Sequence, residues 1–147
     1  MDTTIRDMQE KDLPQVLALV KELAVYEKEP DAVIASINTY EQAFEQGVFE
    51  GMVMLYKDKI IGMMIYYMTF STWKGKMLYL EDFIITEQHR NKGLGQQLFN
   101  SFLKKAREKE AILCKWQVLD WNTPAVQFYK KNAAILEKEW WNGKICI

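Results

Sequence analysis

The sequence predicts an α/β protein with a mixed, mostly antiparallel central sheet in one layer and helices packed on its faces. Two observations lead to this fold class. Apolar residues recur at helical spacing in segments 12–27 and 93–108, and three strand-like segments follow one another between residues 52 and 86. A chain of 147 residues is long enough for one self-sufficient core, so we expect a single domain over 1–147.

Composition and charge exclude several classes of protein. The chain is 49% hydrophobic and 27% charged, with a formal net charge of -1, so no basic field would recruit nucleic acid. No apolar run approaches the roughly 20 residues that span a bilayer. Residues 1–6 do not resemble a signal peptide, so we expect a cytoplasmic protein without a membrane partner. Cys114 and Cys146 make neither a disulfide framework nor a zinc pattern, and we expect both thiols to be free and buried.

Two helices are predicted in the N-terminal third. Segment 12–27 carries its apolar residues at helical spacing, and Asp12 is a plausible N-cap. Segment 39–46 is expected to be a shorter helix, because Thr39 and Gln42 have the spacing of a capping box.

Strands are predicted at 4–8, 52–56, 60–70 and 77–86. The middle two are separated by residues 57–59, which indicates a hairpin.

The remaining elements alternate between helix and strand. We expect a helix over 93–108 with a charged outer face, a strand over 112–119, a short helix over 123–131 and two final short strands within 135–147. The inward positions of the first of these helices are Leu94, Leu98, Phe102 and Leu103.

The most specific local feature is a glycine turn, Arg90-Asn91-Lys92-Gly93-Leu94-Gly95, between a predicted strand and a predicted helix. A helix N-terminus has unpaired N–H groups and a partial positive charge, and glycine lets the backbone approach an anion closely. A pyrophosphate is the natural ligand. Neither a P-loop nor a dinucleotide fingerprint fits, because Gln96 and Leu98 stand where those motifs need other residues. Taken alone, a solvated glycine turn with no ligand is almost as good an interpretation.

Further segments extend this pattern into a family resemblance. The Arg-x-x-Gly-x-Gly turn resembles the coenzyme A pyrophosphate loop of the GNAT superfamily, and segments 120–124 and 128–131 resemble its second cofactor segment. Segments 21–27 and 79–83 resemble the spermidine/spermine acetyltransferase subfamily. Segments 71–76 and 118–122 are most similar to its diamine or thialysine acetyltransferase branch.

The resemblance implies a GNAT acyl-CoA N-acyltransferase fold and acetyl-CoA as cosubstrate. It implies transfer of the acetyl group to a primary amine of a small molecule, by direct attack in a ternary complex. It also implies a homodimer, with the C-terminal strands near the subunit contact. The cofactor-binding residues implied are Phe83, Ile84, Ile85, Arg90, Asn91, Lys92, Gly93, Leu94, Gly95, Gln96, Asn122, Thr123, Pro124, Ala125 and Tyr129.

Amine acetylation has two proton transfers to arrange. A lysine-type amine has a pKa near 10.4, so only roughly one molecule in a few thousand is neutral at pH 7. Glu81 is the candidate base, and the family resemblance makes Tyr129 the general acid for the departing thiolate. Glu81 and Asp82 are adjacent in a strand and so should face opposite sides, with Glu81 toward the pocket. Without the resemblance, Tyr129 would be expected simply to pack its ring in the core.

The amine itself is expected to contact acidic and aromatic side chains, because both attract a cation. The substrate-binding candidates are Tyr26, Glu27, Trp73, Glu81 and Asp82. Ser71 and Thr72 replace an acidic residue and a proline of polyamine-preferring members, and Lys74 adds positive charge. These departures favour thialysine or a lysine-like amino acid.

Three alternatives stay open: a spermidine/spermine acetyltransferase, a protein acetyltransferase on the same fold, and a non-catalytic coenzyme A-binding module. The single His89 is expected to be a loop residue, and nothing suggests a metal site.

Overall fold

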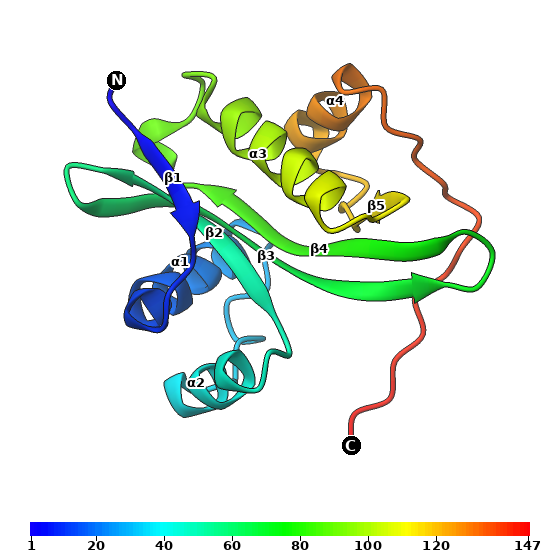
Figure 1. The fold of residues 1–147 in the computed structure, drawn as a ribbon, viewed down its shortest axis with the longest axis horizontal. Helices are drawn as coiled ribbons and strands as arrows, with labels where there is room; N and C mark the ends of the chain where they lie inside the picture. The colour runs from blue at the N-terminus through cyan, green and yellow to red at the C-terminus, as the bar shows by residue number, and fades with distance from the viewer. The chain divides into compact units, whose positions relative to one another are not determined.

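A computed structural model describes all residues, 1–147, and divides into two compact units, 1–116 and 117–147. Figure 1 labels the elements of both units. The first unit contains β1 (Thr4–Asp7), α1 (Leu13–Tyr26), α2 (Ile37–Glu45), β2 (Glu50–Tyr56), β3 (Lys59–Ser71), β4 (Gly75–Ile85), α3 (Leu94–Glu108) and β5 (Leu113–Lys115), with 3-10 turns at Glu10–Asp12 and Glu87–His89. The second contains α4 (Thr123–Lys131).

The sheet has the strand order β1-β2-β3-β4-β5. The first three pairs are antiparallel and β4 pairs with β5 in parallel, which confirms the predicted mixed, mostly antiparallel sheet. The predicted hairpin is present between β2 and β3. Its turn has two residues, Lys57 and Asp58, both with positive φ, which matches the twist of the flanking strands.

Helices cover both faces of this sheet, with α1 and α2 on one side and α3 on the other (Figure 1). On the first side a buried cluster joins α1 to the strands; its members include Leu13, Val16, Leu19, Val53, Met63, Ile65 and Ile84. On the other side α3 contributes Phe99 and Phe102, whose rings pack against Phe83, Tyr66 and Trp116. The predicted inward residues of α3 are buried except Leu103, which is half-buried. No helix of the chain is long and apolar enough to cross a membrane.

The start of α2 differs from the prediction. Ser36 is the N-cap, and its hydroxyl accepts a hydrogen bond from the Thr39 N–H at 3.3 Å. Thr39 is therefore the third residue of the helix and not its cap. The sequence offers a hydroxyl at both positions, and only the backbone geometry at Ser36 decides between them.

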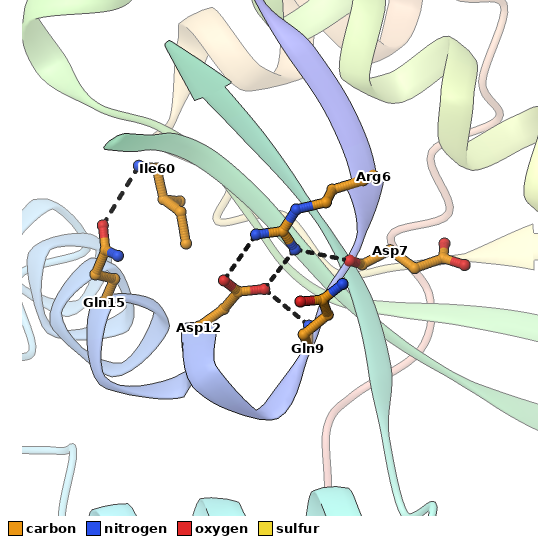
Figure 2. Close-up of polar contacts among 6 residues, drawn as sticks. All are labelled: Arg6, Asp7, Gln9, Asp12, Gln15 and Ile60. Atoms are coloured by element: carbon orange, nitrogen blue, oxygen red, sulfur yellow. Dashed lines mark hydrogen bonds and ion pairs between the residues drawn. The ribbon is translucent and has the colours of Figure 1, made fainter. Parts of the chain in front are cut away.

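Asp12 is the N-cap residue of α1, as predicted, but its side chain makes no capping hydrogen bond to that helix. Both carboxylate oxygens accept hydrogen bonds from Arg6, at 2.7 and 3.0 Å, and one also accepts the Gln9 N–H at 2.8 Å (Figure 2). The Asp12 side chain is only 4% exposed. The Arg6 hydrogen bond is the main cause that lowers the pKa of Asp12 below its usual value, against the effect of burial. This bidentate pair ties β1 to the start of α1. Nearby, the Gln15 side chain accepts the Ile60 N–H at 3.3 Å and ties α1 to β3 (Figure 2).

The C-terminal strands are the least accurate part of the sequence prediction. The strand expected over 112–119 is only β5, three residues long, and residues 135–147 form no strand. A strand is stable only beside a second strand that satisfies its backbone groups, and the sheet of this chain ends at β5. The apolar tail residues Trp140, Trp141, Ile145 and Ile147 are all exposed.

Both cysteines are free, as expected, but neither is fully buried. Cys114 is half-buried on β5 and Cys146 is exposed in the tail. The prediction of two buried thiols was wrong, because Cys114 lies on the short edge strand β5 and Cys146 lies in a tail that forms no strand.

The Arg6–Asp12 pair makes stability depend on pH. Because the folded pKa of Asp12 lies below its unfolded value, the pair stabilises the fold above about pH 4 and is lost as pH falls through the folded pKa. We expect Asp12→Asn to lower the free energy of unfolding by about 2 kcal/mol at pH 7. The difference from wild type should shrink below pH 4 in urea titrations.

Asp7→Asn is the matched control, since Asp7 also lies on β1 and forms a 3.0 Å ion pair, with Lys105 of α3, but its side chain is 70% exposed. An exposed pair contributes at most about 1 kcal/mol. Equal losses for the two variants would contradict the assignment of Asp12 as the main tie of β1.

Candidate functional site

Strands β4 and β5 separate early, and this opens one edge of β4. The two strands pair only where Met77–Tyr79 face Leu113–Lys115. From Leu80 onward no other strand of the sheet lies on that side of β4. The open part of β4 leads through the turn at Glu87–His89 directly to the start of α3.

The glycine turn lies at the N-terminus of α3, as predicted. Gly93 is the N-cap with φ 76°, and Asn91 also has a positive φ of 62°. A Cβ at Gly93 would meet nothing within 4 Å, so glycine is needed there for its backbone conformation and not for space. A Cβ at Gly95 would make ordinary contact, 3.7 Å from the Phe83 ring. The helix therefore begins with bare backbone N–H groups, which is the arrangement that binds phosphate.

Arg90 is engaged inside the protein. Its Nε donates a hydrogen bond to the Ile85 carbonyl at 2.8 Å, and its guanidinium lies over the Tyr26 ring at 5.2 Å from the centroid. A longer ion pair of 3.9 Å joins it to Glu22 on α1. Arg90 thus braces the glycine turn against β4 and α1, and direct phosphate contact by its side chain stays a prediction.

A β-bulge in β4 brings two carboxylates to one face of the sheet. Ile65 lies opposite Asp82 and Tyr66 lies opposite Leu80, so Glu81 is an extra residue with no partner on β3. Strict alternation, which would send Glu81 and Asp82 to opposite sides, does not hold here. The irregularity ends before Phe83–Ile85, which stay in register with Gly62–Met64.

Burial and like charge raise the pKa values of the groups around the two carboxylates. Burial is the main cause that raises the pKa of Asp82 to about 6, and the charges of Glu81 and Glu27 add to it. The pKa of Tyr40 on α2 is raised by burial and then by Asp82 and Glu81. Burial likewise raises the pKa of Glu27 at the end of α1. The site therefore has an acidic centre, formed by β4 and the end of α1, with no cation among the groups that shift Asp82.

The other predicted substrate-binding residues lie at different distances from this centre. Tyr26 and Glu27 are at the C-terminal end of α1, on the side where Arg90 contacts that helix. Trp73 is 85% exposed in the turn between β3 and β4. Glu81 lies six positions along the strand from Gly75, so the single chain leaves Trp73 about 20 Å away from the carboxylates.

Sequence reasoning missed two tyrosines of this site. The Tyr67 hydroxyl donates a hydrogen bond to Glu81 Oε2 at 3.1 Å, and Tyr40 faces the same carboxylates from α2. Counting residues back from the β3–β4 turn places Tyr67 opposite Tyr79, which was a usable signal. The bulge that aims Glu81 at Tyr67 leaves no such signal.

The second unit holds the remaining predicted residues. Asn122 is the N-cap of α4, and its side chain accepts the Ala125 N–H at 3.4 Å. Thr123 and Pro124 form the first turn of the helix. Tyr129 is 7% exposed, and its ring meets Phe128 edge-on at 5.5 Å between centroids.

Asp82 should destabilise the fold at neutral pH. Its folded pKa of about 6 lies above the unfolded value near 4, so stability falls as pH rises from about 4 to 6 and stays lower above that. We expect Asp82→Asn to raise the free energy of unfolding by on the order of 1–3 kcal/mol at pH 8, since one pKa unit is about 1.4 kcal/mol.

The gain should be nearly absent at pH 3.5, below the unfolded pKa, and the exposed Asp31→Asn should show no gain at either pH. Chemical denaturation at both pH values measures this. A loss of stability at pH 8, or an equal gain at both pH values, would contradict it.

Comparison with known proteins places this site in a family. The model of the acetyltransferase (GNAT) family matches residues 8–134. A thialysine N-epsilon-acetyltransferase of Bos taurus is 32% identical over 155 residues, covering 94% of this chain and 88% of that protein. One from Caenorhabditis elegans is 31% identical over 115 residues, covering 78% and 72%.

The fold has a close match among solved structures. An aminoglycoside acetyltransferase from an uncultured soil metagenomic sample superposes with a TM-score of 0.82 over 99% of this chain and 96% of that one, at 18% identity. At this identity the likeness shows the fold alone. The family match takes in the open edge of β4, the glycine turn and α4, and the resemblance noted in the sequence is confirmed: the chain is an acetyltransferase of the GNAT family.

Proposed function

We propose that this protein transfers an acetyl group from acetyl-CoA to the primary amine of a small molecule, by direct attack in a ternary complex. One observation carries the proposal. The strand that ends at the glycine turn also presents two carboxylates, Glu81 and Asp82, on one face. A phosphate-binding helix start and a cation-binding acidic centre on one strand are the two parts that amine acetylation needs.

The residues present fit acetyl-CoA. The bare helix start between Arg90 and Gln96 suits a pyrophosphate, because Gly93 and Gly95 place no side chain over the N–H groups. The open edge of β4 at Phe83–Ile85 offers backbone groups to an extended pantetheine arm. Asn122, Thr123, Pro124, Ala125 and Tyr129 are proposed to complete the cofactor site. The cosubstrate supplies the reactive thioester.

The carboxylates would attract the ammonium form of the substrate and accept its proton. We assign Glu81 as the proton acceptor and Asp82 as its partner in cation binding. Burial and the neighbouring charges of Glu81 and Glu27 raise the pKa of Asp82 to about 6, so the Asp82 carboxylate is still ionised at neutral pH and can attract the ammonium group. Tyr26 and Glu27 would complete the acidic and aromatic surface.

The other end of the reaction needs an acid and an electrostatic stabiliser. Backbone N–H groups of β4 would face the carbonyl oxygen as it gains negative charge. Tyr129 would then give its proton to the departing thiolate. A tyrosine has a pKa near 10 and an alkyl thiol one near 8.5. Proton transfer from the tyrosine to the thiolate is therefore unfavourable by only about 2 kcal/mol.

Thialysine or a lysine-like amino acid is the proposed substrate. Two relatives are named thialysine N-epsilon-acetyltransferases, and Lys74 beside Trp73 suits an amine that carries its own carboxylate. We also propose a homodimer. The exposure of Trp73 and of the apolar tail supports it, since a second copy could bring that tryptophan to the amine.

Gly95→Asp tests the cofactor site with two effects of opposite sign. An acidic residue in the first turn of α3 favours the helix, and Gly95 has room for a Cβ, so the fold should be as stable as wild type or more so. The same charge should repel pyrophosphate and raise the KM for acetyl-CoA on the order of tenfold or more.

Gly95→Ala is the control for the added side chain, and its KM for acetyl-CoA should rise clearly less than that of Gly95→Asp. An unchanged KM in Gly95→Asp would rule out this helix start as the phosphate site.

The activity itself is tested by thiol release from acetyl-CoA with thialysine, lysine, putrescine and spermidine side by side. We expect thialysine or lysine to give the highest kcat/KM, and Tyr129→Phe to lose about 10²–10⁴ of kcat, as removal of a general acid does. Tyr56→Phe, on the β2–β3 hairpin, is the control. A clear preference for spermidine would favour the polyamine alternative. Binding of acetyl-CoA without any acetylated amine would favour a coenzyme A-binding module.

A further inference from the structure

Glu81 needs an anchor that the sheet does not give it. As the extra residue of the bulge it has no partner on β3, and its side chain is exposed. Asp82, on the same face, is a like charge that drives Glu81 away. Left alone, the Glu81 carboxylate would turn toward solvent, and the two carboxylates would not meet one ligand.

Tyr67 supplies a contact that opposes this repulsion. Its hydroxyl donates to Glu81 Oε2 at 3.1 Å from the neighbouring strand. Its ring stacks on Tyr79, the residue opposite it, with 5.4 Å between centroids and 25° between planes. The stacked ring fixes where the hydroxyl lies, so the hydrogen bond fixes the carboxylate.

The hydroxyl stays a donor throughout the working range of the enzyme. Burial, followed by the charge of Glu81 and the hydrogen bond to it, raises the pKa of Tyr67 to about 12. The charged groups facing it are Glu81 and Asp82 on β4, with Tyr79 beside them. Tyr67 therefore acts through its hydrogen bond and takes no part in proton transfer.

We propose that Tyr67 is a positioning residue for the amine site, which holds the Glu81 carboxylate beside Asp82 so that the cationic amine meets both carboxylates at once. The inference rests on the proposed function, because it needs a cationic amine at this face. It adds a residue whose hydroxyl prepares the site before the substrate arrives.

The chain offers a matched pair of variants to test this role. Tyr67→Phe removes the donor and keeps the ring that stacks on Tyr79. Tyr66→Phe makes the same change one residue earlier, on the opposite face, where the ring packs on Phe102 and the buried hydroxyl has no hydrogen-bond partner. Thermal unfolding should be similar for wild type and Tyr67→Phe.

Steady-state kinetics with the best amine of the panel give the main result. Loss of a hydrogen bond to a charged group should lower kcat/KM for the amine about tenfold in Tyr67→Phe, mostly through a higher KM. The KM for acetyl-CoA should stay within about twofold, and Tyr66→Phe should match wild type. A fall in kcat with an equal rise in both KM values would overturn the positioning role and indicate a general structural effect.

A double-mutant cycle shows whether Tyr67 acts through Glu81. In a Glu81→Gln background, Tyr67→Phe should change kcat/KM by less than about twofold, because the charged acceptor is gone. A full tenfold loss in that background would overturn the proposal. If wild type acetylates an amine but Tyr67→Phe behaves like Tyr66→Phe, only the Tyr67 inference fails. If wild type acetylates no amine, the proposed function fails and Tyr67 has no amine site to prepare.

Discussion

The extra residue in β4 is the constraint on which the candidate site depends. Without it, strict alternation would turn Glu81 away from Asp82. With it, both carboxylates face α1 and α2, while Phe83 beyond the bulge packs against α3. The strand also separates from β5 just before this point, so the irregular part of β4 coincides with its open edge. The bulge thus gives β4 an acidic face, and the short β5 leaves it a free backbone edge; the chain then runs through Glu87–His89 to the start of α3.

Asp12 and Asp82, two carboxylates of the first unit that are shielded from solvent, have pKa values shifted in opposite directions. Asp12 is more enclosed, yet its pKa is lowered because Arg6 donates two hydrogen bonds to it. Asp82 has no such cation, and its neighbours Glu81 and Glu27 are acidic, so its pKa is raised. A fold selected only for stability would replace or pair such a group. The destabilisation makes sense if the missing cation arrives with the substrate, whose ammonium group would do for Asp82 what Arg6 does for Asp12.

The sequence was sufficient for features with local causes. The hairpin at Lys57 and Asp58, the Asn122 cap and the helix that starts at the glycine turn all follow from residue type and spacing. Features set by neighbours in space could not be found in this way. The bulge at Glu81 depends on register with β3, and the length of the C-terminal strands depends on whether a further strand is available to pair with them. The choice of Ser36 over Thr39 as a cap depended on backbone angles alone.

The contacts of Arg90 differ from those that its sequence motif suggests. The motif suggests that this arginine serves the phosphate, yet its guanidinium is bonded to the Ile85 carbonyl and lies over Tyr26. Those contacts join the end of β4 to the end of α1, where Glu27 follows Tyr26 directly. The glycine turn and the acidic end of α1 are thus held by one side chain. If the proposed cofactor site is right, this arginine would serve it by fixing the backbone of the glycine turn, and the same contacts would fix the end of α1 beside the proposed amine site.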